Sequence, residues 1–273
     1  MSRRLPIQVI AGAALVGIIV LAALLSLIWT PQSYAVVDVS ERFQPPGPAY
    51  WLGTAQLGRD VLPQLMVGAR HSLGIALIAV GLGGGIGTML GLLAAARGGL
   101  VEEIVMRLAD FSFAFPALLF AIMLASAFGP SLGNAVIAIA FINIPVFTRI
   151  ACASAKQIWS RDYVLAARAS ARTGLAITLD HIVPNIAAVV IVQATIDFAG
   201  AILVEAALSY LGLGVQPPLP SWGRMLSEAQ TLLYLAPQLA IFPGLCIVAA
   251  VLGFNLLGDG LRDLADPRLQ QRR

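Results

Sequence analysis

Long apolar stretches alternate with shorter polar segments along the chain. A helix rises about 1.5 Å per residue, so roughly 20 apolar residues cross a hydrocarbon core of about 30 Å. Six stretches approach this length: 7–29, 72–96, 111–128, 132–151, 186–209 and 233–257. The pattern predicts an all-α membrane protein with six transmembrane helices. The short third stretch contains Pro116, and the last contains Pro237 and Pro243, which can kink it.

The first apolar stretch has some features of a signal peptide. It follows Arg3 and Arg4 and precedes small residues at 33–35. Its apolar run is about 22 residues, however, whereas the core of a signal peptide has roughly 7–15. We therefore interpret residues 1–30 as a retained anchor helix.

Composition supports a membrane protein. The 273 residues are 59% hydrophobic and only 11% charged, whereas soluble domains carry roughly 25% charge. The formal net charge of +3 is too small to suggest a nucleic-acid partner. Cys152 and Cys246 lie far apart without a ligand cluster nearby, so we interpret both as small buried apolar residues.

Arginine and lysine concentrate on the cytoplasmic side of membrane proteins. With the N-terminus in the cytoplasm, six crossings return the C-terminus there, and 259–273 becomes a cytoplasmic tail. Thirteen cations then lie inside: Arg3, Arg4, Arg97, Arg107, Arg149, Lys156, Arg161, Arg168, Arg172, Arg262, Arg268, Arg272 and Arg273. Four lie outside: Arg42, Arg59, Arg70 and Arg224. This excess predicts that both termini lie in the cytoplasm. The loop 152–185, within a core of 72–258, is expected on the same side.

The longest polar interruption between strongly apolar stretches is 161–184, which indicates two short helices. One face of the first helix has small residues and a tyrosine: Tyr163, Ala166, Ala167 and Ser170. Gly174 suits a helix C-terminus or a turn, and Pro184 suits a first helical turn. A small-residue face permits close approach to a partner, and the alternative is a solvated basic loop.

The first outer loop, 31–71, is proline-rich and ends in a stretch with apolar residues at helical spacing. We interpret this stretch as a short amphipathic helix at the outer membrane surface, or as a docking or gating element for an external partner. The second outer loop, about 210–232, contains three prolines that make it stiff. There, Trp222 suits the aromatic belt at the interface.

Two acids interrupt the fifth stretch. A carboxylate at mid-membrane costs roughly 2.5–3.5 kcal/mol, which the surrounding apolar residues offset. Asp197 and Glu205 are eight residues apart and so share a helix face. They could line a substrate path or fix helix packing as buried carboxyls, and Glu205, nearer the outer end, could simply contact water.

The second stretch contains Gly83, Gly87 and Gly91, a register that lets helix backbones approach closely. The chain has no G-x-x-x-x-G-K-[ST] or H-E-x-x-H motif. Its histidines, His71 and His181, lie near no catalytic constellation. We therefore expect no enzymatic activity, no cofactor and no metal site in this chain.

Several motifs in order resemble permease subunits of ATP-binding-cassette importers, most closely the dipeptide and oligopeptide C type. They are LGTAQLGRDVL at 52–62, GAR at 68–70, LSYLGLGVQPP at 208–218, PSWG at 220–223 and PGL…FNLLGDGLRDLADPRL from 243 to 269. The segment 161–184 resembles the cytoplasmic EAA loop of that family. The chain departs from the pattern at Ala55, where an acid is usual, at Leu165, where a glutamate is usual, and at Ala171, where a glycine is usual.

The resemblance implies an assembly in the bacterial plasma membrane. A second permease subunit would complete a heterodimeric pore. Two separate ATPase subunits would bind ATP and Mg²⁺, and an extracytoplasmic binding protein would deliver peptide. Coupling to the ATPases is expected at Arg161, Asp162, Tyr163, Ala166, Ala167, Arg168 and Gly174. Docking of the binding protein and outer gating are expected at Gly53, Gly58, Arg59, Asp60 and Trp222, and the substrate path at Asp197 and Glu205.

Three alternatives remain open from sequence. The same architecture could import nickel, a nickel chelate or another small solute. An ion-coupled secondary transporter could use Asp197 and Glu205 as ion sites, although we find no internal repeat of the kind such proteins show. A membrane scaffold without transport would show no substrate-stimulated ATP hydrolysis when reconstituted.

Overall fold

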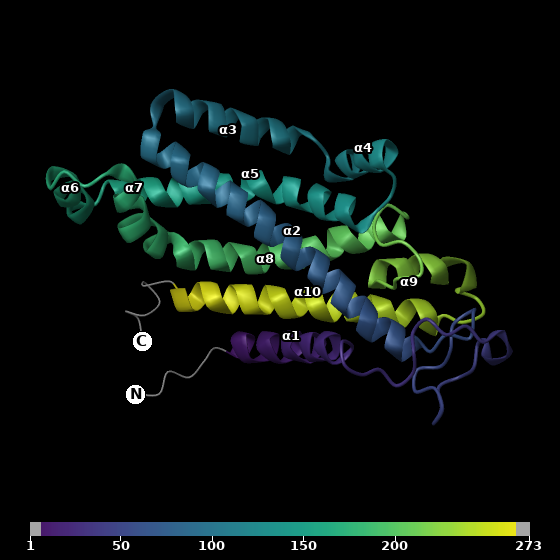
Figure 1. Cartoon of the computed structure of the whole chain (residues 1–273). Helices are drawn as coiled ribbons and strands as arrows, with labels where there is room; N and C mark the ends of the chain where they lie inside the picture. The colour runs from purple at the N-terminus through teal and green to yellow at the C-terminus, as the bar shows by residue number, and fades with distance from the viewer. Residues whose placement is uncertain (1–6, 266–273) are drawn as a thin grey trace.

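A computed structural model describes residues 7–265 of the chain, and these residues are mostly helical (Figure 1). The α-helices in chain order are α1 Ile7–Leu25, α2 Val61–Arg97, α3 Gly99–Ala114, α4 Ala117–Phe128, α5 Leu132–Trp159, α6 Asp162–Ala169, α7 Gly174–Ile177, α8 Val183–Tyr210, α9 Trp222–Ala229 and α10 Gln238–Ala265. Short 3₁₀ turns lie at Val39–Glu41 and Gln230–Leu232, and a π-helical turn at Thr178–Ile182 joins α7 to α8.

The long helices lie side by side in an elongated bundle (Figure 1). α6, α7, the start of α1 and the end of α10 lie at one end, which we call the α6 end. The first long loop and α9 lie at the other, which we call the α9 end. Among the described residues, five helices are long and apolar enough to cross a membrane, and the bent pair α3–α4 gives a sixth if it counts as one span. The predicted all-α, multi-span fold is confirmed.

The third apolar stretch is a broken helix, in contrast to the single span expected at 111–128. α3 and α4 meet at an angle of 83°. Pro116 lies at the N-terminus of α4, and Phe115 before it is extended, with ψ 117°. Proline has no N–H for the helical ladder and disfavours helical geometry in the residue before it. The chain therefore bends at this proline.

The amphipathic helix expected in the first outer loop does not exist as a separate element. Residues 61–71 are the first turns of α2, which continues without a break to Arg97. Val61 and Leu65 belong to the main buried cluster of the bundle. The apolar face of these turns therefore packs on protein and does not lie on the membrane surface as we expected.

α2 and α5 pack closely along most of their length, as the glycine register predicted. A Cβ atom at Gly83, Gly87 or Gly91 would meet backbone atoms of α5. The close approach of the two backbones therefore requires glycine at these three positions.

Several element ends differ from the expected boundaries. α5 continues to Trp159 and α8 begins at Val183, so the segment between them is 160–182, shorter than the expected 152–185. α10 continues to Ala265, so the expected tail 259–273 begins within a helix. Five of the thirteen cations assigned to the inside lie outside the described residues; these are Arg3, Arg4, Arg268, Arg272 and Arg273.

Candidate functional site

The inner face of α6 packs on the bundle. Val164 is fully buried in a cluster with Trp159, Ile177 and Ile182, and Ala167 packs against the same cluster. Of the alanines expected to dock a partner, Ala167 is therefore half-buried against the chain's own helices, whereas Ala166 is exposed. The expected docking face is split between the two sides of α6.

Several apolar side chains are exposed on the solvent-facing side of α6 and on the turns that follow it. Tyr163 is 47% exposed and Leu165 49%, and Leu175 on α7 is 71% exposed. Leu179, one turn beyond Leu175, is also exposed. We call Tyr163, Leu165, Ala166, Leu175 and Leu179 the α6 surface. A cluster of exposed large apolar side chains at the polar end of a bundle is typical of a protein interface.

The basic residues of this segment mainly brace it. The guanidinium of Arg168 lies over the Trp159 ring, 4.6 Å from its centroid. Arg172 forms an ion pair of 3.0 Å with Asp180 and lies 3.5 Å from the His181 ring nitrogen. The Arg168 contact joins α6 to the end of α5, and the Arg172 contacts join the turn after α6 to the π-helical turn before α8. Arg161 and Asp162, at the start of α6, are exposed.

The turn after α6 is made by Ala171, in contrast to the expectation for Gly174. Ala171 has a positive φ of 57°, a left-handed conformation that glycine adopts at lower cost. Gly174 instead begins α7, and the Thr173 hydroxyl caps this helix by accepting a hydrogen bond from the Ala176 N–H. The resemblance placed a glycine at position 171, and the backbone there has the conformation that favours one.

Trp222 is buried at the α9 end, and the aromatic-belt interpretation was wrong. The side chain is 1% exposed. Its indole N–H donates a hydrogen bond of 3.1 Å to the carbonyl of Leu65, in the first turns of α2. Gly68 on α2 leaves room for the ring, because a Cβ there would lie 3.2 Å from Trp222 Cδ1. Trp222 therefore fastens α9 to α2.

Three of the other predicted outer residues shape the turn before α2. Gly53 and Gly58 have positive φ angles of 78° and 70°. Asp60 is buried and caps α2, its carboxylate accepting a hydrogen bond of 3.1 Å from the Leu62 N–H. Burial raises the pKa of the Asp60 carboxyl above its ordinary value, although the Leu62 N–H acts in the opposite direction. All three residues are buried in this turn and are not available as surface contacts.

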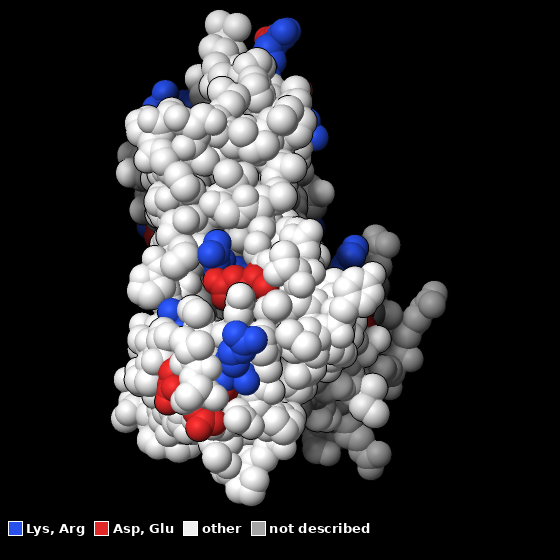
Figure 2. Space-filling model, turned by 90° about the vertical axis from the view of Figure 1, so that its right-hand side faces the viewer, with Lys and Arg blue, Asp and Glu red and all other residues white. Residues whose placement is uncertain are grey.

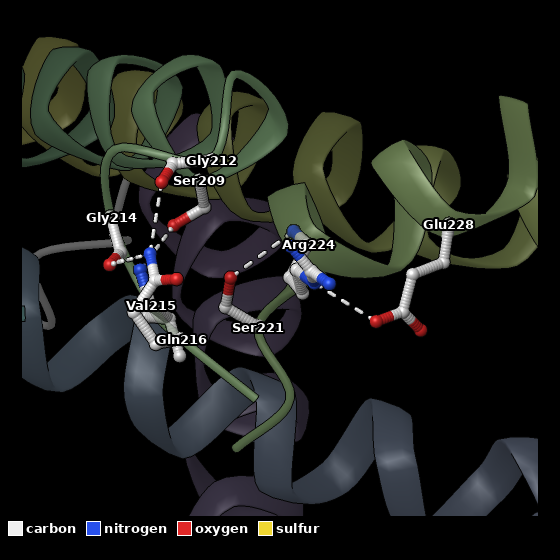
Figure 3. A network of polar contacts seen from close by, with 8 residues as sticks. All are labelled: Ser209, Gly212, Gly214, Val215, Gln216, Ser221, Arg224 and Glu228. Atoms are coloured by element: carbon white, nitrogen blue, oxygen red, sulfur yellow. Dashed lines mark hydrogen bonds and ion pairs between the residues drawn. The ribbon is translucent and has the colours of Figure 1, made fainter. Parts of the chain in front are cut away.

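Arg59 lies on that turn and lines a cavity at the α9 end. The cavity has a volume of about 370 Å³, and a second arginine, Arg224 of α9, lines it as well. Arg224 donates to Glu228 at 2.9 Å (Figure 3). From the sequence alone, Arg224 is only one of the four cations assigned to the outer side. Its position two residues after Trp222 becomes informative because the tryptophan fixes α9 against α2.

Glu205 is buried within protein, contrary to the expectation that it could contact water. It is 0% exposed, and Ser209 donates a hydrogen bond of 2.7 Å to one carboxylate oxygen. Ser72 of α2 and Ser221 also face the carboxyl, although its second oxygen has no hydrogen bond to any described residue. Figure 3 shows Ser209 and Ser221 at the two ends of the loop that joins α8 to α9. The geometry places Glu205 as a packing group among α8, α2 and this loop.

Asp197 occupies a different environment from Glu205. It is half-buried and accepts a hydrogen bond of 3.0 Å from Gln193, one turn earlier on α8. Within the described part of the chain, its second oxygen is buried without a hydrogen bond. A groove of about 910 Å³ runs between α1, α2, α8 and α10, and neither Asp197 nor Glu205 lines it. The two acids therefore have different hydrogen-bond partners, and neither lines this groove.

Comparison with known proteins places the chain in a family. Residues 87–271 match the family model described as binding-protein-dependent transport system inner membrane component. The chain is similar to the dipeptide transport system permease protein DppC of Alkalihalophilus pseudofirmus, with 41% identity over 96% of this chain and 86% of that protein. It is also similar to the glutathione transport system permease protein GsiD of Pectobacterium atrosepticum, with 41% identity over 82% of this chain and 75% of that protein.

A solved structure shares the fold. The match is to a structure titled inward facing conformations of the MetNI methionine ABC transporter, with a TM-score of 0.61. It covers 73% of this chain and 95% of that one at 17% identity, which supports the fold alone. The family model and the identity to two permease proteins decide the family. The chain is a multi-pass membrane protein and belongs to the inner membrane components of binding-protein-dependent transport systems.

Proposed function

We propose that the chain is one of two transmembrane subunits of an ATP-driven importer of dipeptides or short oligopeptides. The observation that carries the substrate class is its similarity, at 41% identity over 96% of its length, to a protein named as a dipeptide transport system permease. Relatives named for glutathione transport agree with this class, because glutathione is itself a short peptide. The second permease subunit would be a different chain of the same fold.

The α6 surface would dock one of two separate ATPase subunits. It has the exposure that docking requires, and the inner face of α6 is held by Val164 and Trp159, so force applied to the surface would reach α5 and α8. ATP and Mg²⁺ would bind the ATPase subunits. In this arrangement the α6 end lies in the cytoplasm, and the α9 end faces an extracytoplasmic solute-binding protein.

Reconstitution tests this proposal. The chain, its second permease subunit and the ATPase subunits are co-purified from the native membrane and placed in lipid vesicles with the solute-binding protein. Dipeptides are expected to stimulate ATP hydrolysis. Their transport across the vesicle membrane is expected to depend on this hydrolysis. If nickel but not peptides stimulates ATP hydrolysis, the substrate is nickel and the proposed peptide class is wrong. Solute uptake driven by an ion gradient without ATP would contradict the importer.

Asp197→Asn tests whether this carboxylate contributes to transport. If the carboxylate pairs with a cationic group of the peptide, uptake should fall at least about tenfold, because hydrogen bonds to charged groups contribute about 1.5–3 kcal/mol. Uptake of free and N-acetylated dipeptides is measured in the reconstituted vesicles. Equal kinetics in the variant and the wild type for both peptides would assign Asp197 to helix packing.

A further inference from the structure

The cavity at the α9 end has the composition of a carboxylate-binding site. It is formed by segments distant in sequence: the turn before α2, the first residues of α2 and α10, and α9. Its charged and amide side chains include Arg59, Gln64, Arg224 and Glu228, and apolar side chains line most of the rest. Two arginines and one glutamate therefore line the same cavity of about 370 Å³.

Arg59 is held on a rigid turn, and no acidic side chain among residues 7–265 pairs with it. The Ala55 N–H donates a hydrogen bond of 2.8 Å to the Arg59 carbonyl, and the Gly58 N–H donates one of 2.9 Å to the Ala55 carbonyl. The Arg59 Nε is buried and has no hydrogen bond to a described residue. A guanidinium carries five N–H donors and no acceptor, and no described residue supplies the acceptor that this nitrogen lacks.

Arg224 is preorganised beside it. Ser221 caps α9 by accepting a hydrogen bond of 3.2 Å from the Arg224 N–H, and Trp222 anchors the same helix turn. Arg224 Nε donates to Glu228, which leaves the terminal guanidinium nitrogens for another acceptor (Figure 3). Glu228 offsets one of the two cations, so the three side chains keep a net positive charge.

The surroundings of the cavity favour a protein partner over a transported solute. Figure 2 views the α9 end and shows acidic and basic side chains gathered near its centre, amid an otherwise mostly uncharged surface. The cavity is built from an outer turn and a short helix, and it is separate from the apolar groove between α1, α2, α8 and α10. The chain's family depends on a binding protein for transport.

We propose that this cavity receives the carboxylate of an Asp or Glu side chain of the solute-binding protein when that protein docks. A planar guanidinium binds a carboxylate through two parallel hydrogen bonds, and such pairs are geometrically specific. The carboxylate accepts hydrogen bonds from the terminal guanidinium nitrogens of Arg59 and Arg224. This inference rests on the proposed importer function and adds the chemistry by which its outer partner is recognised.

Docking affinity measures the prediction directly. The complete transporter in lipid nanodiscs is titrated with the solute-binding protein that stimulates its ATP hydrolysis. Arg59→Gln is expected to raise the Kd at least about tenfold, because truncating one partner of a desolvated charge pair costs more than that. The Kd of Arg59→Lys should lie between those of the wild type and Arg59→Gln. Lysine keeps the positive charge but cannot form two parallel hydrogen bonds with a carboxylate. Arg42→Gln is the matched control, because Arg42 is exposed in the same loop and does not line the cavity.

The acidic partner is identified by changing each surface Asp and Glu of the binding protein to its amide. One such change should weaken docking to the wild type as much as Arg59→Gln does, and should have no further effect on docking to that variant. Equal assembly of the variants, checked by size-exclusion chromatography, excludes misfolding as the cause.

Three results would overturn the proposal. Docking of Arg59→Gln with wild-type affinity would show that the cavity holds no partner carboxylate. The same conclusion would follow if Arg42→Gln lost as much docking affinity as Arg59→Gln. Arg59→Gln could instead dock normally but show a raised KM for free dipeptides and an unchanged KM for C-terminally amidated ones. This result would assign the cavity to the substrate. Failure of the wild-type transporter to bind any solute-binding protein would refute the importer function itself, and is thereby distinguished from failure of the carboxylate site.

Discussion

Ala166→Trp is expected to leave the chain inserted and assembled but to uncouple ATP hydrolysis from peptide uptake. Ala166 is exposed on the outer face of α6, so the larger side chain fits the isolated chain without displacing its own helices. At a packed interface, by contrast, overpacking costs about 1–3 kcal/mol, so docking of the ATPase should weaken roughly 5- to 150-fold. Uptake and ATP hydrolysis are measured together in reconstituted vesicles.

Two further variants make this result specific. Ala166→Ser adds little volume and should transport as the wild type does. Ala167→Trp should instead disturb the cluster around Val164 and lower the stability of the chain itself, because Ala167 packs inward. Normal uptake with normally stimulated ATP hydrolysis in Ala166→Trp would show that the α6 surface does not dock the ATPase.

Trp222→Ala is expected to cause the largest loss of stability at the α9 end. The substitution leaves a cavity where the indole ring packs against Gly68, and it removes the hydrogen bond to the Leu65 carbonyl. Replacing a buried Trp by Ala costs about 3–5 kcal/mol. The thermal unfolding of the purified chain in detergent, followed by circular dichroism, should shift to lower temperature, and binding-protein docking should weaken because α9 lines the cavity.

Trp51→Ala provides the control for this prediction. Trp51 lies in the first outer loop and is 63% exposed, so its removal should change the unfolding temperature little. Trp222→Phe separates the two contributions of the indole, since it keeps most of the ring volume and removes the N–H donor. An unfolding temperature for Trp222→Ala equal to that of Trp51→Ala would refute the role of Trp222 as the fastening between α9 and α2.

Some structural features could be predicted because their causes are local. A glycine every four residues faces one side of a helix whatever lies opposite, so the close packing of α2 at Gly83, Gly87 and Gly91 followed from spacing. Residues 61–66 illustrate the limit. Their apolar spacing describes an amphipathic helix equally well whether its face lies on lipid or on protein, and only the neighbouring helices decide between the two.

The candidate site was predicted in part for the same reason. Tyr163 and Ala166 lie exposed as expected, since a short helix between two spans projects from the bundle. Ala167 lies three residues after Val164 and therefore on the same face of α6, which packs against Ile177 and Ile182. The sequence offers a row of small residues, and only the cluster beneath α6 decides which of them stay free.

Arg59 and Arg224 were not predicted as a pair. They are distant in the chain, and each is a single cation in an outer loop when the sequence is taken alone. The cavity brings both together because Trp222 fixes α9 against the first turns of α2. The water contact considered for Glu205 was wrong for a related reason, since two of the serines around it come from α2 and from the loop before α9.

The sequence by itself determined the number of apolar stretches, the glycine register of α2 and the membrane class of the protein. These properties depend on residues close together in the chain. The tertiary structure alone decided which polar groups are buried, which face of α6 is free and which charges share a cavity. Such properties depend on pairs like Trp222 and Leu65, which are 157 residues apart and meet only because the helices between them pack.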